Sequence, residues 1–386
     1  MPSHPPSSTL HPRRLLVRGV NWLGDAVMTT PALQRLRQRF PQAHITLLTH
    51  EKLADLWQDH PSLDAVISFP AKASLWSVAR RLRNEHFDTA LVLPNSPRSA
   101  LEVWLARIPR RLGYARSWRN AFLTHTVPAR PGHVRMRKRA PGEIKRLLDT
   151  PIPTPPPASA HQIHEYLHLA AALGANPAPL SPQLHVPPHF YPTLTARFGL
   201  PPGSRPLFGL NAGAEYGPAK RWPTERFLAA AVELQQRTHC QWLIFGGPSD
   251  TQLAGDIATG IQRQIAAVPG SASFEPPLNL AGQTTLRELM ALLKLCRVLL
   301  TNDTGPMHVA AALDTPVVAL FGSTSPELTG PGLPGDPRHR LLKAQVPCAP
   351  CFLRTCPIDF RCMQSLTVEQ VVETVLQLSG ELHRAV

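Results

Sequence analysis

Long apolar runs are missing from this chain of 386 residues, although hydrophobic residues make up 43% of it. No stretch reaches the roughly 18 consecutive apolar residues that a membrane span needs. The first residues, MPSHPPSSTLHPRR, also lack the apolar core of a secretory signal. These absences argue against a spanning anchor and a signal peptide. We therefore expect a cytoplasmic protein with a disordered leader at residues 1–12.

Acidic residues are scarce in the first part of the chain. Residues 1–150 hold 24 Lys+Arg against 10 Asp+Glu, whereas the remaining residues hold 16 of each, so the net charge of +14 falls in the first part. A basic half indicates an anionic partner, namely nucleic acid, a membrane surface or a phosphorylated substrate. A solvated surface in an Arg-rich protein is the alternative. Because the basic half lacks interleaved aromatics and any known nucleic-acid-binding motif, no nucleic acid partner is expected.

Short apolar runs alternate with helical patterns, which predicts an α/β fold. In the first half, the runs RRLLVR, HITLLT, AVISF and TALVL are typical of buried strands. The second half repeats the pattern with PLFGLNAG, QWLIFGG, RVLLTNDTG and TPVVALFGST. Strands separated by helices favour parallel sheets with right-handed crossovers. Ligands bind such sheets at the carboxyl ends of the strands, so we expect a cleft between two domains.

Proline-rich segments indicate where the domains divide. We predict a first domain at residues 13–186, a second at 193–370 and a closing C-terminal helix at 367–386. Within the first domain, about residues 130–160 contain RMRKR and PIPTPPPASA without helical or strand periodicity. This composition predicts a mobile loop or insertion.

The strongest chemical signal is NDTGPMHVAAAL, where a predicted strand turns into a helix. It places Asp303, Thr304, Gly305 and His308 at the helix start, whose unpaired N–H groups and positive dipole end suit a phosphate. An ordinary capped helix would also carry Asp and Thr there.

Two further loops follow predicted strands in the second half. NAGAEYGPAKRWP contains Gly213, Ala214 and Lys220, and backbone amides with one ammonium group suit a diphosphate. A surface loop with a solvated lysine is the alternative. In FGGPSD, Gly246 permits a tight turn and Asp250 could accept hydrogen bonds from ribose hydroxyls, which is a weak signal by itself.

A fourth signal, VNWLGDAVMTTP, follows the first predicted strand. Gly24 is expected to let the loop turn, and Asp25 lies at the start of the next helix. A carboxylate beside an incoming hydroxyl can act as a general base. Asp25 could equally be only the helix cap.

Together these segments resemble glycosyltransferase family 9, the ADP-heptose:lipopolysaccharide heptosyltransferases, over roughly Arg13 to the C-terminus. The resemblance rests on NWLGDAVMTTPAL, AGAEYGPAKRWP, NDTGPMHVAAAL and the terminal CAPCFLRTCP run. It implies a GT-B fold of two Rossmann-like domains. It also implies ADP-L-glycero-β-D-manno-heptose as the donor in the C-terminal domain, and the heptosyl-Kdo-lipid A inner core as the acceptor in the N-terminal domain. The implied transfer inverts the sugar and requires no cofactor or metal for chemistry.

The resemblance also assigns roles to individual residues. Asp25 would be the base, Lys220 would hold the diphosphate, and the donor site would include the glycine-loop and helix-start residues named above. The acceptor would contact Asn21, Trp22, Gly24 and Asn95. A cytoplasmic enzyme of this kind could lie peripherally at the inner membrane, beside its anionic lipopolysaccharide acceptor. A family member with another acceptor remains open, and so does a GT-B-like sugar-nucleotide epimerase, which would need no acceptor site.

Four of the six cysteines, Cys348, Cys351, Cys356 and Cys362, lie close together near the C-terminus. Four thiolates suit a tetrahedral structural zinc, but only the first pair has the usual two-residue gap. The alternatives are four reduced thiols, some packed in the core, and disulfides, which a cytosolic protein disfavours. In each case we expect the cluster to stabilise the C-terminal segment rather than to perform the transfer.

Overall fold

The computed structural model describes residues 11–200 and 205–381, which divide into two compact units. The first unit comprises Met1–His133 and Ser159–His185, and the second comprises Val134–Ala158 and Val186–Val386. Most of the predicted leader at residues 1–12 lies outside the described residues, as do the last five residues of the predicted closing segment. That segment otherwise forms the helix α14.

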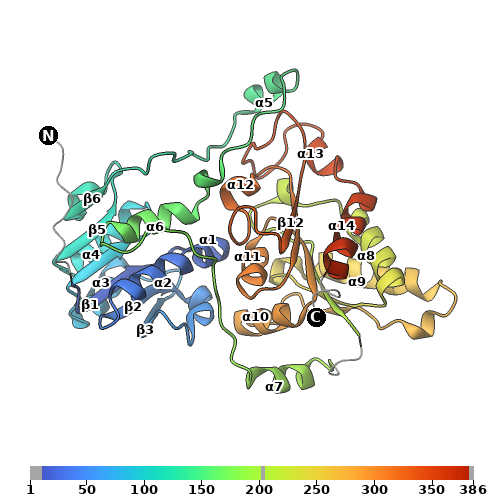
Figure 1. Cartoon of the computed structure of the whole chain (residues 1–386), viewed down its shortest axis with the longest axis horizontal. Coiled ribbons are helices and arrows are strands. Elements are labelled where there is room, and N and C mark those ends of the chain that lie inside the picture. The colour runs from blue at the N-terminus through green and yellow to red at the C-terminus, as the bar shows by residue number, and fades with distance from the viewer. Residues whose placement is uncertain (1–10, 201–204, 382–386) are drawn as a thin grey trace. The chain divides into compact units, whose positions relative to one another are not determined.

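The first unit is built on a parallel sheet with the strand order β3-β2-β1-β4-β5-β6 (Figure 1). Its strands are β1 (Arg14–Arg18), β2 (His44–His50), β3 (Ala65–Phe69), β4 (Thr89–Val92), β5 (Arg110–Tyr114) and β6 (His125–Val127). Its helices are α1 (Leu23–Met28), α2 (Thr30–Arg39), α3 (Leu75–Asn84), α4 (Pro97–Leu105) and α6 (Ile163–Ala171). The predicted strand runs therefore do form the sheet.

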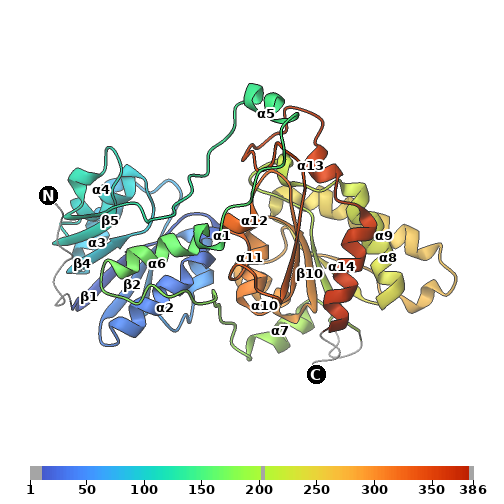
Figure 2. The same cartoon turned by 45° about the horizontal axis from the view of Figure 1, so that its top comes forward.

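Apolar residues on both faces of the central strand explain why this sheet is covered by helices. Leu15, Leu16 and Val17 of β1 are all completely buried. Successive side chains of a strand point to opposite faces, so both faces need a cover. Leu16 packs in a core cluster with residues of α3 and α4, which lie against each other, while α2 packs against α6 (Figure 2).

The second unit repeats this plan with the strand order β12-β11-β10-β7-β8-β9. Its strands are β7 (Leu207–Asn211), β8 (Gln241–Ile244), β9 (Leu278–Asn279), β10 (Val298–Asn302), β11 (Val317–Phe321) and β12 (His339–Lys343). Its helices are α5 (Pro141–Leu147), α7 (Phe190–Arg197), α8 (Thr224–Thr238), α9 (Thr251–Ala266), α10 (Leu286–Leu295), α11 (Gly305–Ala312), α12 (Pro326–Thr329), α13 (Arg361–Gln364) and α14 (Val368–Glu381). All its paired strands run parallel.

The proline-rich segment differs from the predicted mobile insertion of the first domain. Residues 134–158 group with the second unit and contain α5, whose Ile144 is 1% exposed within that unit's core. The backbone N–H of Arg139 donates to the carbonyl of Cys351 at 3.0 Å. A helix signal was present, because Pro141 stands at the helix start, with Glu143 in the first turn.

Both sheets have the strand order of a doubly wound nucleotide-binding fold. In each, the chain starts in the middle, at β1 or β7, and later returns to the other side of that strand with β4 or β10. The carboxyl ends of these paired strands are the topological switch points, where ligands bind in open α/β sheets. Across residues 11–200 and 205–381, no helix combines the length and the apolar character that crossing a bilayer requires.

Candidate functional site

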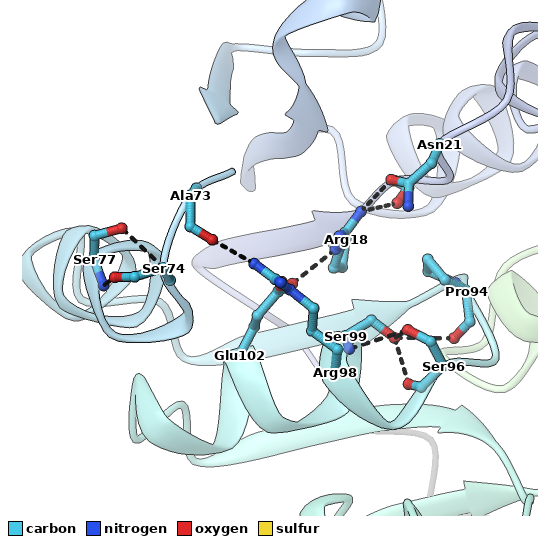
Figure 3. A network of polar contacts seen from close by, with 11 residues as sticks. Arg18, Asn21, Ala73, Ser74, Ser77, Pro94, Ser96, Arg98, Ser99 and Glu102 are labelled. Atoms are coloured by element: carbon cyan, nitrogen blue, oxygen red, sulfur yellow. Dashed lines mark hydrogen bonds and ion pairs between the residues drawn. The ribbon is translucent and has the colours of Figure 1, made fainter. Parts of the chain in front are cut away.

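The loop after β1 is anchored by a buried ion pair. Arg18 and Glu102 of α4 are 3% and 0% exposed, and Arg18 Nε lies 2.9 Å from Glu102 Oε2 (Figure 3). The other carboxylate oxygen accepts from Arg98 at 3.2 Å. Arg18 Nη1 donates to Asn21 Oδ1 at 3.1 Å. Because each buried charge has a partner, the pair fixes the predicted acceptor loop without an uncompensated charge.

Asp25 lies in the first turn of α1, where the helix dipole favours a negative charge. Gln162, which directly precedes α6, donates from Nε2 to Asp25 Oδ1 at 3.1 Å and to the Tyr166 hydroxyl at 2.8 Å. Burial raises the pKa of the Tyr166 phenol well above its usual value, and the charge of Asp25 adds to the shift. The amide donor of Gln162 orients the Asp25 carboxylate.

The remaining predicted acceptor residues have separate environments. Trp22 is 45% exposed, and Lys52 Nζ lies 5.5 Å from its ring centroid. Gly24 is the second residue of α1, so the expectation that it forms a turn is wrong. Asn95 follows β4 at the same switch point and accepts from Arg119 Nη1 at 3.3 Å.

Arg119 is a buried cation that the sequence analysis did not single out. It is 0% exposed, and Nη1 also donates to the Pro94 carbonyl at 2.7 Å. Within the described residues its Nε and Nη2 have no hydrogen-bond partner. Burial, together with the charge of Arg116, lowers the pKa of Arg119 to about 10. Arg119, which lies between β5 and β6, therefore places a positive charge beside the loop after β4, and no described side chain forms an ion pair with it.

In the second unit, the loops after β7 and β10 are joined at the switch point. Asn302 Nδ2 donates to the Ala212 carbonyl at 2.8 Å, and the Trp222 N–H donates to Asn302 Oδ1 at 3.0 Å. Asn211 Nδ2 donates to Thr304 Oγ1 at 2.8 Å. These bonds bring the predicted loop around Gly213 next to the predicted start of α11.

Lys220 and Asp303, which were predicted separately, form an ion pair at 2.6 Å between Nζ and Oδ2. The same Oδ2 accepts from Thr324 Oγ1 at 2.5 Å, so the loop after β11 joins the site as well. The side chains of Lys220 and Asp303 are 15% and 5% exposed, and this burial makes the contact stronger than a surface pair. The pair fixes the direction of the one ammonium group in this loop.

The start of α11 is not capped by a side chain. Thr304 stands at the N-cap without a side-chain cap bond, because its hydroxyl is bonded to Asn211. Gly305 is the first helical residue and is partly exposed, whereas His308 is buried one turn later. The first-turn N–H groups therefore form a local positive end that suits an anion.

The loop after β8 packs against the Gly213 loop. A Cβ at Gly213 would lie 2.5 Å from the carboxylate of Asp250, and one at Gly246 would lie 2.9 Å from the Asp250 Cβ, so both glycines are required by close approach. Asp250 Oδ2 accepts from the Gly247 N–H at 3.1 Å. The Ala214 carbonyl accepts from Arg221 Nη2 at 3.4 Å. The predicted donor residues thus gather in one part of the second unit.

The cysteine segment supports two of these loops. The N–H groups of Cys351 and Phe352 donate to the Ser323 carbonyl at 3.1 and 2.8 Å, and the Tyr216 hydroxyl donates to the Phe352 carbonyl at 2.8 Å. The Ala219 N–H donates to the Arg354 carbonyl at 2.9 Å. The Tyr216 ring also lies between two cations, 5.3 Å from Lys220 Nζ and 5.2 Å from the Arg354 guanidinium carbon.

All four clustered cysteines are free thiols that line one small cavity, together with Ile144 and Ser323. Burial raises the pKa of Cys362 to about 12, and it also raises the pKa values of Cys348 and Cys351. Within the described part of the chain, no three His, Cys, Asp or Glu side chains converge as metal ligands. Cys348 and Cys362 belong to the core of the second unit, and Cys351 packs against it.

Comparison with known proteins gives the class of protein. The profile of glycosyltransferase family 9 (heptosyltransferase) matches residues 75–360, which is well over half of the chain. The chain therefore belongs to this family and is a glycosyltransferase, as its motifs predicted.

The individual relatives are heptosyltransferases. Lipopolysaccharide heptosyltransferase 2 of Salmonella typhimurium is 32% identical over 331 residues, covering 82% of this chain and 85% of that protein. The structure of Escherichia coli ADP-heptose lps heptosyltransferase II has a TM-score of 0.73 and 28% identity, covering 96% of this chain and 99% of the other. That of Escherichia coli heptosyltransferase WaaC with ADP, at 17% identity and a TM-score of 0.66, covers 95% and 99% and shares the fold. The predicted fold class is confirmed.

Proposed function

We propose that this protein transfers heptose from ADP-L-glycero-β-D-manno-heptose to the heptosyl-Kdo-lipid A inner core of lipopolysaccharide. The observation that carries this proposal is the position of the chemical groups at both switch points. An oriented carboxylate, Asp25, follows β1, and a cation with a helix start, Lys220 and α11, lies beside β7 and β10. Heptosyltransferase WaaC, solved with ADP and with ADP-2-deoxy-2-fluoro heptose, supports the donor, and the relative named lipopolysaccharide heptosyltransferase 2 supports the acceptor.

On the donor side, the diphosphate would lie between Lys220 and the first turn of α11. The ammonium group and the helix N–H groups would stabilise the negative charge that develops on ADP as it leaves. Asp303 would not contact the phosphates, because two anions repel each other. Its role would be to aim Lys220, with Thr324 holding the carboxylate in place.

On the acceptor side, Asp25 would remove the proton from the attacking hydroxyl. The hydroxyl oxygen forms a bond to the anomeric carbon on the face opposite ADP, the bond from that carbon to the phosphate oxygen breaks, and the proton passes to the carboxylate. One displacement inverts the anomeric centre. Gln162 would keep Asp25 in the required direction through its hydrogen bond to Oδ1.

Asn21, Trp22 and Asn95 belong to the loops proposed to hold the acceptor. The uncompensated charge of Arg119 lies behind Asn95 and would favour an anionic sugar there. With its lipid-anchored acceptor, the enzyme would work in the cytoplasm, peripherally at the inner membrane.

We propose no metal for the chemistry. A structural zinc at the four cysteines stays the alternative, and all four side chains line one small cavity. We propose instead that the reduced thiols pack the segment that carries Phe352 and Arg354, and thereby the donor loops.

Mass spectrometry tests the function directly. Purified protein is incubated with ADP-heptose and heptosyl-Kdo-lipid A, and in parallel with an acceptor that lacks the first heptose. The proposal predicts the mass gain of one heptose on the first acceptor only. A gain on the heptose-free acceptor alone would indicate the family member with a different acceptor, and interconversion of the donor with neither acceptor modified would indicate an epimerase.

A further inference from the structure

The tryptophans are distributed unevenly between the two units. The second unit buries Trp222 and Trp242, which are 1% and 0% exposed. In the first unit Trp57 is buried at 2% and Trp22 belongs to the predicted acceptor loop, whereas Trp76, Trp104 and Trp118 are 69%, 44% and 89% exposed. A single exposed apolar residue needs no explanation, but several large ones on one surface mark an interaction site. These three indoles therefore indicate a binding surface on the first unit.

The three indoles belong to neighbouring elements. Trp76 is in the first turn of α3 and Trp104 is near the end of α4, and these two helices pack against each other. Arg83 Nη2 of α3 donates to the Leu105 carbonyl of α4 at 2.7 Å, which ties the two helices together beside Trp104. The Trp104 ring lies 5.7 Å from the Phe122 ring in the short helix η2 (Asn120–Phe122).

Trp118 lies in the loop just before η2, and its backbone is held at a φ of 65°. A bulky residue is uncommon in this left-handed region, yet the loop presents the indole to solvent. We call the exposed surface of α3, α4 and this loop, with Trp76, Trp104 and Trp118, the tryptophan face.

The tryptophan face is strongly basic. Residues 71–122 hold 10 Lys+Arg against 3 Asp+Glu. All three acids are bound by arginines: Glu85 by Arg14, Asp88 by Arg110, and Glu102 by Arg18 and Arg98. Among the described residues, the exposed side chains of Arg80, Arg83 and Arg107 form no ion pair. Arg80 and Arg83 follow Trp76 by four and seven residues, so all three share one side of α3.

We propose that the tryptophan face docks the enzyme on an anionic lipid bilayer. Indoles are favoured at the headgroup level, where the ring is partly buried and its N–H stays hydrated. The charges of Arg80, Arg83 and Arg107, which no carboxylate pairs with among the described residues, complement anionic headgroups. The inference rests on the proposed function, since a lipid A-anchored acceptor lies at a bilayer surface. It also fits the acceptor loops, because Asn95 lies two residues before the start of α4 and Arg119 directly precedes η2.

Vesicle binding by the full chain, without substrates, tests the docking. We expect strong partitioning onto vesicles of phosphatidylethanolamine and phosphatidylglycerol, and at least tenfold weaker partitioning onto pure phosphatidylcholine or in 0.5 M salt. The double variant Trp76→Ser/Trp104→Ser should bind the anionic vesicles at least tenfold more weakly than wild type. Arg80→Gln/Arg83→Gln should weaken binding to these vesicles roughly 25-fold, because each cation near an anionic surface contributes about fivefold.

Two exposed residues of the second unit supply matched controls. Ile152→Ser and Arg263→Gln should leave vesicle binding unchanged, because Ile152 is 51% exposed and Arg263 is exposed on α9 of the second unit. Trp118→Asn removes the third indole and keeps a residue that tolerates a positive φ. ADP affinity and the melting temperature should stay at wild-type values in Trp76→Ser/Trp104→Ser, which separates docking from folding.

Transfer to a delipidated, soluble acceptor distinguishes this inference from the proposed function. The variant Trp76→Ser/Trp104→Ser should keep that activity and lose activity on acceptor embedded in vesicles. Equal vesicle binding by wild type and variant would overturn the docking proposal. A wild-type dimer that the variant loses in sedimentation velocity, without any vesicle binding, would also overturn it and assign the face to a second copy. Vesicle binding without any heptose transfer would overturn the proposed function and leave the docking intact.

Discussion

The two units share one strand order but differ in their surface chemistry. The first unit holds 18 Lys+Arg against 9 Asp+Glu, and the second holds 22 against 17. The sequence places the whole excess of charge in the first 150 residues, yet Val134–Ala158 carries part of it into the second unit. The first unit also exposes four of its five tryptophans, whereas the second unit buries both of its own. The same fold thus supports two kinds of binding surface.

The buried ion pairs of the two units also differ in where they lie. In the first unit, Arg18 and Glu102 are 4% and 0% exposed along their side chains and hold a loop from within. In the second unit, Lys220 and Asp303 lie at the proposed diphosphate site, bounded by a helix start. Under the proposed function, the first unit would bind the anionic, lipid-linked acceptor, and the second would bind the nucleotide through loops and a helix end.

Replacement of Asp25 should reduce kcat more than any other change, and its effect should be confined to the first unit. Asp25→Asn keeps the shape and the bond from Gln162 but removes the basicity. We expect kcat to fall by roughly 10²–10⁴-fold, the usual contribution of a general base, with the Kd for ADP unchanged in calorimetry. Glu233→Gln, an exposed site on α8, is the control. Near-normal turnover in a folded Asp25→Asn protein would remove Asp25 from the base role.

Acid should destabilise both units, because each contains a buried neutral histidine. Burial lowers the pKa of His60 in the first unit and of His339 in the second to about 4. In the unfolded chain each histidine takes up a proton near pH 6.5, whereas in the folded protein it stays neutral down to about pH 4. The free energy of unfolding is therefore undiminished above pH 6.5 and falls as the pH drops towards 4. Each histidine should lower the free energy of unfolding by about 3 kcal/mol over that range.

The variant His339→Leu isolates the second unit, since neither ring nitrogen of His339 has a hydrogen-bond partner within the described residues. Thermal unfolding between pH 7 and 4.5 should show a smaller loss of stability in this variant than in wild type. Parallel pH curves for the two proteins would show that His339 does not titrate on unfolding.

Removal of the Lys220 ammonium group should affect the second unit. Lys220→Ala should weaken ADP binding by roughly 10–100-fold, the range expected for a hydrogen bond to a charged group. Arg263→Ala, an exposed site on α9 away from the donor loops, is the control. Unchanged ADP affinity in calorimetry would place the diphosphate elsewhere.

The fold could be predicted from the sequence, and so could the grouping of the proposed donor residues at strand ends, because these signals are local. Apolar runs define the strands, and Asp303 and Lys220 stand in short motifs beside strand ends. Contacts between distant segments had no such signal. Gln162 donates a hydrogen bond to Asp25, which is 137 residues away in the sequence, and Thr324 donates one to the Asp303 carboxylate. Arg119 resembles any surface arginine in a basic sequence, and only the structure shows that it is buried.

Added salt should weaken acceptor binding more than ADP binding, with a smaller effect than the substitutions above. Charges on the basic surface are exposed and therefore screened, whereas the Lys220 side chain is only 15% exposed. Between 0.05 and 0.5 M salt we expect the acceptor KM to rise several-fold and the ADP Kd to change less. Equal salt dependence of the two constants would contradict the division of roles.

Chelation should have the smallest effect. Because no metal is proposed in the chemistry and the cysteines are packed as thiols, incubation with EDTA should leave turnover and melting temperature unchanged. Stoichiometric zinc in active protein purified without a chelator, together with a lower melting temperature after its removal, would instead establish a structural metal at the four cysteines.

The anomeric configuration of the product tests the central claim most directly. With β-configured ADP-heptose as donor, a single displacement assisted by Asp25 must give an α-linked heptose, which the one-bond carbon–hydrogen coupling at the anomeric centre identifies in NMR. The account predicts the α linkage. A β-linked product would require two displacements and a nucleophile on the enzyme, and it would contradict the role given to Asp25.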